Sequence, residues 1–264
     1  MLAAKKAPDT DHTLPDAFFR EEYALNAQIA ALKKPLLSVW DGIVMGGGAG
    51  ISVHGRYRVA SEHALFAMPE TSIGFFPDVG ASYFLSNLDG ELGTYLALTG
   101  SRIGSADLLY TGLATHYVER DALADLYEGL SGCDDDGAVS SLLRRLGSAP
   151  ASPPPLEQVR ERIDRCFGQP SVVAIEEALE RDASEWGTAT LSVLRKTSPT
   201  SRAVAFRLLR EARGRSLEEC LVSEFRASQR FMEPPSDFFE GIRAALIDKD
   251  RSPAWSPSTS SEVS

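Results

Sequence analysis

The spacing of apolar and polar residues predicts a long first helix. Residues 16–34 carry an apolar stripe of helical period, with Asp16 at the start, Lys33 and Lys34 near the end, and Pro35 just beyond. An acidic start and a basic end both suit the helix dipole, and Asp16 is a suitable N-cap residue. We therefore expect this helix to end before Pro35.

Shorter elements follow in the first half of the chain. Apolar runs predict strands at residues 36–40, 57–60, 64–67 and 114–118, and helices at 79–87, 92–99 and 106–110. Residues 41–52 are expected to form a turn, a glycine cluster and a short helix.

From residue 121 the chain has a helical period almost throughout. Residues 147–155 interrupt it with a connector that contains three successive prolines. The later helical segments are 156–166, 172–186, 190–196, 201–213, 216–231 and 237–246. The expected fold class is therefore α/β, with an α/β part over residues 1–119, an α-helical region over 120–255 and a disordered Ser-rich tail over 256–264.

Composition and charge narrow the class of protein. Apolar residues are 43% and charged residues 24% of the 264 residues, as in a globular protein with a buried core. The 27 basic and 37 acidic residues give a net charge of −10, which argues against broad electrostatic binding to nucleic acid or anionic membranes. No apolar run approaches the roughly 20 residues that span a bilayer. We expect neither a nucleic-acid partner nor membrane insertion.

Cysteine and histidine give no sign of a disulfide framework or a metal site. The three cysteines are odd in number and widely spaced, which is typical of a protein in a reducing compartment. The four histidines follow no metal-ligand spacing. The first 16 residues contain no apolar signal segment and more acidic residues than a transit peptide carries.

Residues 46–50, Gly-Gly-Gly-Ala-Gly, form the clearest cluster of small residues. Between a strand and a helix, backbone N–H groups can face an anion or an oxyanion. The cluster lacks the Lys-Ser/Thr of a phosphate-binding loop and fits the dinucleotide fingerprint poorly. A tight turn with close helix packing is the alternative interpretation.

Two carboxylates each follow a proline among apolar residues. Glu70 comes after Pro69, and Asp78 comes after Pro77. Apolar surroundings raise the pKa of a carboxyl, which suits acid, base or nucleophilic chemistry. The alternatives are an exposed loop acid at position 70 and a helix N-cap at position 78. No Gly-x-Ser-x-Gly segment indicates a serine hydrolase.

Several motifs together resemble the enoyl-CoA hydratase/isomerase (crotonase) superfamily. They lie at residues 34–35, 42–50, 66–70, 74–80 and 98–100. Further motifs resemble the branch that hydrolyses 3-hydroxyisobutyryl-CoA, and these lie at residues 19–23, 52–55, 114–116, 198–201 and 241–255. The resemblance runs from about residue 16 to residue 257. It implies a spiral core of ββα turns, followed by a helical region that packs over the active site.

The carboxylate pattern separates the branches of this superfamily. Its hydratases use two glutamates to add water. The first of those positions is Gly50 in this chain, whereas the second is Glu70. Asp78 stands where the hydratases usually carry glycine. One catalytic acid is absent and another is present, which resembles the hydrolase pattern.

The resemblance also implies a role for each matching residue. Gly47 would supply a backbone N–H to the oxyanion, and Glu70 would act as nucleophile or as a base for water. Asp78 would assist proton movement or hold the substrate hydroxyl, and Glu22 would line the substrate pocket. Without the resemblance, Glu22 is more typical of a solvated partner of the helix dipole.

The implied reaction belongs to valine breakdown and yields 3-hydroxyisobutyrate and CoA. It requires no metal or redox cofactor, and CoA is part of the acyl-CoA substrate. Relatives in eukaryotes are mitochondrial, whereas a bacterial protein would be cytoplasmic. Homo-oligomers occur in the superfamily. The alternatives are a hydratase or isomerase acting on another acyl-CoA, and a non-catalytic paralogue associated with the mitochondrial ribosome.

One departure from the family concerns the start of the chain. The superfamily core begins with strands and a glycine-rich segment that supplies the other oxyanion N–H, and this chain has no match to them. We therefore expect an N-terminally truncated core. Either the gene model is incomplete and the sequence is a fragment of a longer protein, or the protein is a degenerate paralogue.

Overall fold

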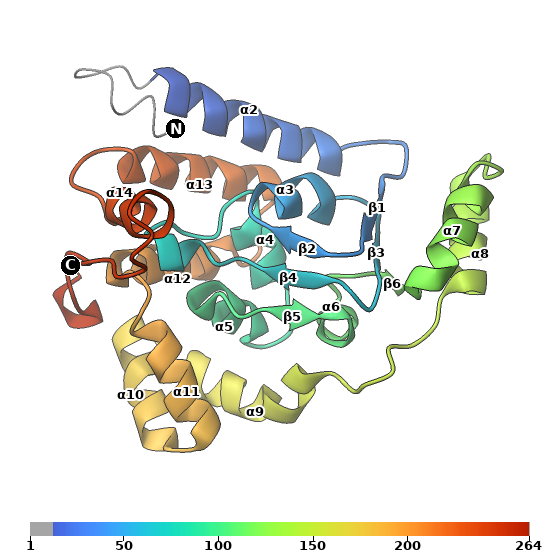
Figure 1. Ribbon diagram of the computed structural model, residues 1–264. Coiled ribbons are helices and arrows are strands. Elements are labelled where there is room, and N and C mark those ends of the chain that lie inside the picture. The colour runs from blue at the N-terminus through green and yellow to red at the C-terminus, as the bar shows by residue number, and fades with distance from the viewer. Residues whose placement is uncertain (1–12, 264) are drawn as a thin grey trace. The chain divides into compact units, whose positions relative to one another are not determined.

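The structure, a computed structural model, describes residues 13–263 (Figure 1). Predictions made from the first twelve residues lie outside the described residues. The chain forms two compact units. The first, here called the helical unit, combines residues 13–28 with Met68–Ser101 and residues 163–263. The second, the sheet unit, combines Ile29–Ala67 with Arg102–Arg162.

Each unit is formed by stretches of the chain that are not contiguous in sequence. The linear division at residues 119 and 255 that the sequence predicts stays a prediction.

The sheet unit contains two three-stranded sheets. In one, β1 (Leu37–Trp40) and β6 (His116–Tyr117) flank β3 (Tyr57–Ala60), and all pairs are parallel. In the other, β4 (Leu65–Ala67) pairs parallel with β2 (Ile43–Met45) and antiparallel with β5 (Ile103–Gly104). Strand β2 was not expected from the sequence, because three residues next to a glycine cluster give too short a pattern to detect.

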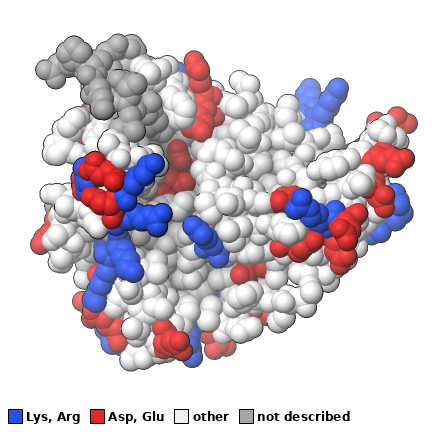
Figure 2. Space-filling model, in the orientation of Figure 1, with Lys and Arg blue, Asp and Glu red and all other residues white. Residues whose placement is uncertain are grey.

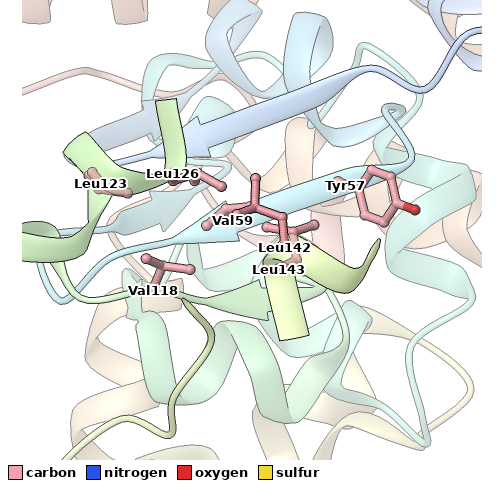
Figure 3. Packing of buried hydrophobic residues seen from close by; sticks show 7 residues of the cluster. All are labelled: Tyr57, Val59, Val118, Leu123, Leu126, Leu142 and Leu143. Carbon is pink, nitrogen blue, oxygen red and sulfur yellow. The ribbon is translucent and has the colours of Figure 1, made fainter. Parts of the chain in front are cut away.

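Helical elements also belong to this unit. They are α3 (Gly47–Val53), α6 (Ser105–Thr111), η2 (Arg120–Ala122), α7 (Leu123–Leu130) and α8 (Asp136–Leu146). The side chains of α7 and α8 pack on β3 and on the residue after β6, in a cluster of Tyr57, Val59, Val118, Leu123, Leu126, Leu142 and Leu143 (Figure 3). The carboxylate of Asp135 caps α8 by accepting from the Ala138 N–H.

The helical unit contains most of the remaining elements. They are α2 (Thr13–Ala30), η1 (Glu70–Ile73), α4 (Ala81–Ser86), α5 (Leu92–Thr99), α10 (Val172–Asp182), α11 (Glu185–Leu194), α12 (Pro199–Ala212), α13 (Leu217–Phe231), α14 (Asp237–Ile242), η3 (Arg243–Ile247) and η4 (Ser260–Glu262). The helix α9 (Pro155–Phe167) contains Ile163, where the chain passes from the sheet unit to the helical unit.

Three predictions for these helices need correction. Asp16 lies in the first turn of α2 and is not its N-cap, because the helix already begins at Thr13. The predicted segment 172–186 is two helices, since Ala183 has a positive φ of 50° and Ser184 caps a new helix. The tail, expected to be disordered, is placed in the structure: buried Ser260 bonds to Arg202 and Glu176.

Charged side chains of both signs are interspersed over the face shown in Figure 2. None of the described helices combines the length and the apolar character needed to cross a bilayer. Within residues 13–263, no three His, Cys, Asp or Glu side chains are grouped as metal ligands.

Candidate active site

Glu70 is buried at the start of the 3-10 turn η1. Only 7% of the residue is exposed, so the alternative of an exposed loop acid is wrong. Its carbonyl accepts from the Phe75 N–H at 3.0 Å, which closes the loop after η1. Among the described residues, its Oε2 atom has no hydrogen-bond partner.

Two glycines let α14 pack directly against η1. Gly74 has a φ of +70°, and a side chain there would collide with the backbone carbonyl of Asp237. A side chain at Gly241 would collide with the carbonyl of Ile73. The Ser198 N–H also donates to the Thr71 carbonyl, at 3.0 Å. The turn that carries Glu70 is thus held by the C-terminal helices.

Burial governs the acid strength of Glu70. Loss of water around the carboxyl raises the pKa of Glu70 to about 8, because the charged form is poorly solvated in a buried position. A carboxylate with an unpartnered oxygen and a raised pKa is more basic and more nucleophilic than a hydrated one.

Asp78 lies on a second loop, eight residues further on. It is 7% exposed, and its Oδ2 atom accepts a 2.8 Å hydrogen bond from the Tyr23 hydroxyl of α2. The N-cap of the following helix, α4, is Gly80. The N-cap alternative for Asp78 is therefore wrong.

Burial and neighbouring acids both act on Asp78. The pKa of Asp78 is raised well above its usual value, first by burial and then by the negative charges of Glu70 and Glu224. The bond from Tyr23 opposes this rise, and Glu22 adds to it. Asp78 therefore holds its proton to a higher pH than an exposed aspartate does.

Glu22 and Gly47 occupy different parts of the molecule. Glu22 is half-buried on α2, and burial raises its pKa, so it is not a fully solvated dipole partner. Gly47 is the first residue of α3 in the sheet unit, after β2 and after Gly46, whose φ is 52°. The helix expected after the glycine cluster is present, but it begins within the cluster at Gly47, and the strand directly before it is β2, which was not expected. The role of Gly47 toward an oxyanion stays a prediction.

Two residues near Asp78 were not selected from the sequence. Tyr23 was assigned to an apolar stripe, but its hydroxyl contacts the Asp78 carboxylate. Glu224 of α13 is fully buried and accepts hydrogen bonds from the loop after Asp78. The helical spacing of buried Leu217, Cys220, Leu221, Glu224, Ser228 and Phe231 is a signal that could have placed Glu224 on the inner face.

Aromatic rings pack around these loops. Phe75 stacks on Phe76 with ring centroids 4.5 Å apart and on Phe19 at 5.7 Å. Phe231 and Phe238 meet the Phe75 ring at 5.4 and 5.0 Å. The stretch between Glu70 and Asp78 is thus anchored in an apolar cluster, as their neighbours in the sequence predict.

The raised pKa values predict a fall in stability with increasing pH. The folded protein binds the Glu70 proton more tightly than the unfolded chain does, so stability decreases from about pH 4.5 to about pH 8. Glu224, with a pKa raised to about 7 by burial, acts in the same direction. In urea unfolding at pH 5.5 and pH 8, we expect Glu70→Gln to show a smaller decrease than the unmodified protein.

Glu240 offers a matched control for this measurement. Hydrogen bonds, chiefly from Arg243, lower the pKa of Glu240 to about 2, so its contribution to stability is lost only as the pH falls below about 4.5. Glu240→Gln should change stability equally at both pH values. An equal decrease with pH in Glu70→Gln and the unmodified protein would contradict the assigned pKa of Glu70.

The sequence and the fold of this chain are both similar to those of known proteins. The family model described as enoyl-CoA hydratase/isomerase matches residues 1–264. Two curated relatives are named 3-hydroxyisobutyryl-CoA hydrolase, mitochondrial. The one from Xenopus laevis is 45% identical over 256 residues, covering 95% of this chain and 66% of the relative. The one from Danio rerio is 44% identical over 269 residues, covering 99% and 70%.

The chain therefore spans about two thirds of the length of these relatives. Among solved structures, a carnitinyl-CoA dehydratase from Mycobacterium thermoresistibile matches with a TM-score of 0.90 and 36% identity, over 100% of this chain and 75% of that chain. The α/β fold of crotonase type expected from the sequence is confirmed.

Proposed function

Because the chain belongs to the enoyl-CoA hydratase/isomerase family, we propose that it hydrolyses the thioester of 3-hydroxyisobutyryl-CoA to 3-hydroxyisobutyrate and CoA. The observation that carries this proposal is the Glu70 carboxyl. It is buried, one of its oxygens lacks a hydrogen-bond partner among the described residues, and Asp78 lies within electrostatic reach. The curated relatives from Xenopus laevis and Danio rerio are named as hydrolases of that thioester.

The proposed reaction begins at the thioester carbonyl carbon. An ionised Glu70 oxygen attacks that carbon, a C–O bond forms, and the negative charge passes to the carbonyl oxygen. Collapse of this intermediate breaks the C–S bond, and the CoA sulfur leaves and takes up a proton. Water then cleaves the mixed anhydride, which releases the acid and restores the Glu70 carboxylate. In the alternative route, Glu70 acts as a base for a water molecule that attacks the same carbon.

The other residues have supporting roles in this proposal. Gly47 keeps the role of oxyanion donor that the family resemblance implies, since the first N–H groups of a helix have no partner within the helix. Asp78, which holds a proton because of its raised pKa, moves that proton or binds the substrate hydroxyl. Glu22 lines the pocket.

Hydrolysis of a thioester changes no oxidation state. Water is the only co-reactant, so the proposal includes no metal or redox cofactor, and CoA enters as part of the substrate. The curated relatives are named mitochondrial, which supports a mitochondrial location for this protein as well.

Release of free thiol tests the proposal. The protein is incubated with 3-hydroxyisobutyryl-CoA, the thiol is measured with a chromogenic reagent, and the acid is identified by mass spectrometry. We expect one thiol for each molecule of 3-hydroxyisobutyrate. Absence of thiol release above the uncatalysed rate would refute the proposed function.

A hydratase is the second candidate, because one of the solved structures that match is that of a protein named as a dehydratase. Adding or removing water across the carbon–carbon bond leaves the thioester intact, so a hydratase releases no thiol. Gly50, buried on α3, offers no second carboxylate for that chemistry. An unsaturated acyl-CoA that is hydrated while all thiol stays bound would favour this candidate.

A further inference from the structure

We infer that Glu224 is a positioning residue that fixes the loop bearing Asp78 in the geometry needed for thioester hydrolysis. This inference rests on the proposed function. Glu224 lies on α13, more than 140 residues after that loop in the sequence, and none of its surface is exposed. A buried carboxylate is costly unless its oxygens are bound, so its partners indicate its role.

All hydrogen bonds recorded for the Glu224 carboxylate come from the loop and from the start of α4. Its Oε2 atom accepts from the Gly80 N–H at 2.7 Å. Its Oε1 atom accepts from the Ser82 N–H at 2.8 Å and from the Ser82 hydroxyl at 2.5 Å. These N–H groups have no partners within the helix, so one side chain satisfies both.

The turn that Glu224 holds is conformationally strained. Val79 has a φ of 54° and Gly80 a φ of 87°. Positive φ is tolerated by glycine, whereas a β-branched residue such as valine adopts it only when surrounding contacts enforce it. Val79 directly follows Asp78, so relaxation of this turn would rotate the aspartate. The two charge-assisted bonds to backbone N–H groups beyond Val79 prevent that relaxation.

Asp78 is therefore held from both sides. Tyr23 of α2 binds its carboxylate directly at 2.8 Å, and Glu224 of α13 fixes the backbone that follows it. Glu224 does not bond to Asp78 itself. Glu224 therefore positions the Asp78 side chain and takes part in no chemical step.

Glu224→Gln is the main test. Glutamine keeps the size of the side chain but replaces one acceptor oxygen with an NH₂ group, which would face an N–H donor. Because a displacement of about 1 Å at a catalytic group can cost about 10²-fold, we expect kcat for thiol release to fall about 10²-fold. Glu218→Gln is the matched control, since Glu218 is exposed on the same helix. Its kcat for thiol release should equal that of the unmodified protein.

A double-mutant cycle separates positioning from general destabilisation. If Glu224 acts through Asp78, adding Glu224→Gln to Asp78→Asn should lower kcat by less than about twofold further. A merely structural role would lower kcat by the same factor in both backgrounds, and that additive result would overturn the inference.

Amide hydrogen exchange gives a readout that needs no substrate. In Glu224→Gln, exchange in residues 78–82 should accelerate at least about tenfold, whereas the α10–α11 pair keeps its protection. Unchanged exchange in the loop would overturn the inference even if thiol release also failed. Absence of thiol release in the unmodified protein, with faster loop exchange in the variant, would refute the proposed function but leave the loop contact established.

Ser82→Ala covers the case in which Glu224→Gln does not fold. It removes only the hydroxyl donor and leaves both backbone bonds to Glu224. We expect a three- to tenfold decrease in kcat, with about twofold faster exchange in residues 78–82. With Glu224→Gln unfolded, an unmodified kcat and unmodified exchange in Ser82→Ala would overturn the inference.

Discussion

Glu70→Gln should lower kcat for thiol release from 3-hydroxyisobutyryl-CoA by about 10³-fold or more, whichever of the two routes operates. The amide can neither form the anhydride nor accept a proton from water. Its size matches the carboxyl, and it does not ionise in the buried position that raises the pKa of Glu70 to about 8. The variant should therefore fold, and thiol release under single-turnover conditions measures its loss.

Two further variants sharpen this result. Glu21→Gln makes the same change at an exposed position of α2 and should leave kcat unmodified. Glu70→Asp withdraws the carboxylate by one carbon, which should cost a direct nucleophile about 10²-fold or more but a base acting through water less. If Glu70→Gln releases thiol at a rate within about tenfold of the unmodified protein, Glu70 is neither the nucleophile nor the base.

Asp78→Asn should lower kcat/KM by about 10²-fold, as for other groups that move protons or bind the reacting substrate. Asparagine keeps an oxygen that can accept from the Tyr23 hydroxyl, so the loop should keep its contact with α2. The comparison of kcat and KM then distinguishes the two roles. Proton movement predicts a loss in kcat, whereas binding of the substrate hydroxyl predicts a rise in KM.

Isobutyryl-CoA, which lacks the hydroxyl, completes the test of Asp78. If Asp78 binds that hydroxyl, Asp78→Asn should abolish the preference for the hydroxylated substrate. Tyr23→Phe is the control, because it removes the donor to Asp78 and keeps the carboxylate, so it should cost less than tenfold. Normal kcat/KM in Asp78→Asn with both substrates would remove Asp78 from the active site.

Helices and strands could be predicted from the sequence where neighbouring residues alone determine them. Strands at residues 57–60 and 65–67 and the helix at 92–99 follow the predicted segments closely, since short apolar runs and capping glycines define them. Glu70 and Asp78 could be selected because apolar neighbours in sequence become apolar neighbours in space. The raised pKa values of both carboxyls agree with that expectation.

Contacts between distant segments were beyond such reasoning. Glu224 binds Gly80 across 144 positions, and Tyr23 binds Asp78 across 55. No local pattern records these pairings, although the helical spacing of α13 does place Glu224 among buried residues. The close approach of α14 to η1 also depends on two glycines, Gly74 and Gly241, whose roles emerge only when both segments are in place.

The most direct test of the central claim is the pH dependence of kcat/KM for thiol release, because this quantity reports the ionisation of essential groups in the free enzyme. The claim is that a buried Glu70 must lose its proton before it acts. It predicts a rate that increases with pH and reaches half its maximum near pH 8, where burial places the pKa of Glu70. A rate that is already constant from pH 5.5 to pH 9 would show an acid of ordinary strength and would contradict the claim.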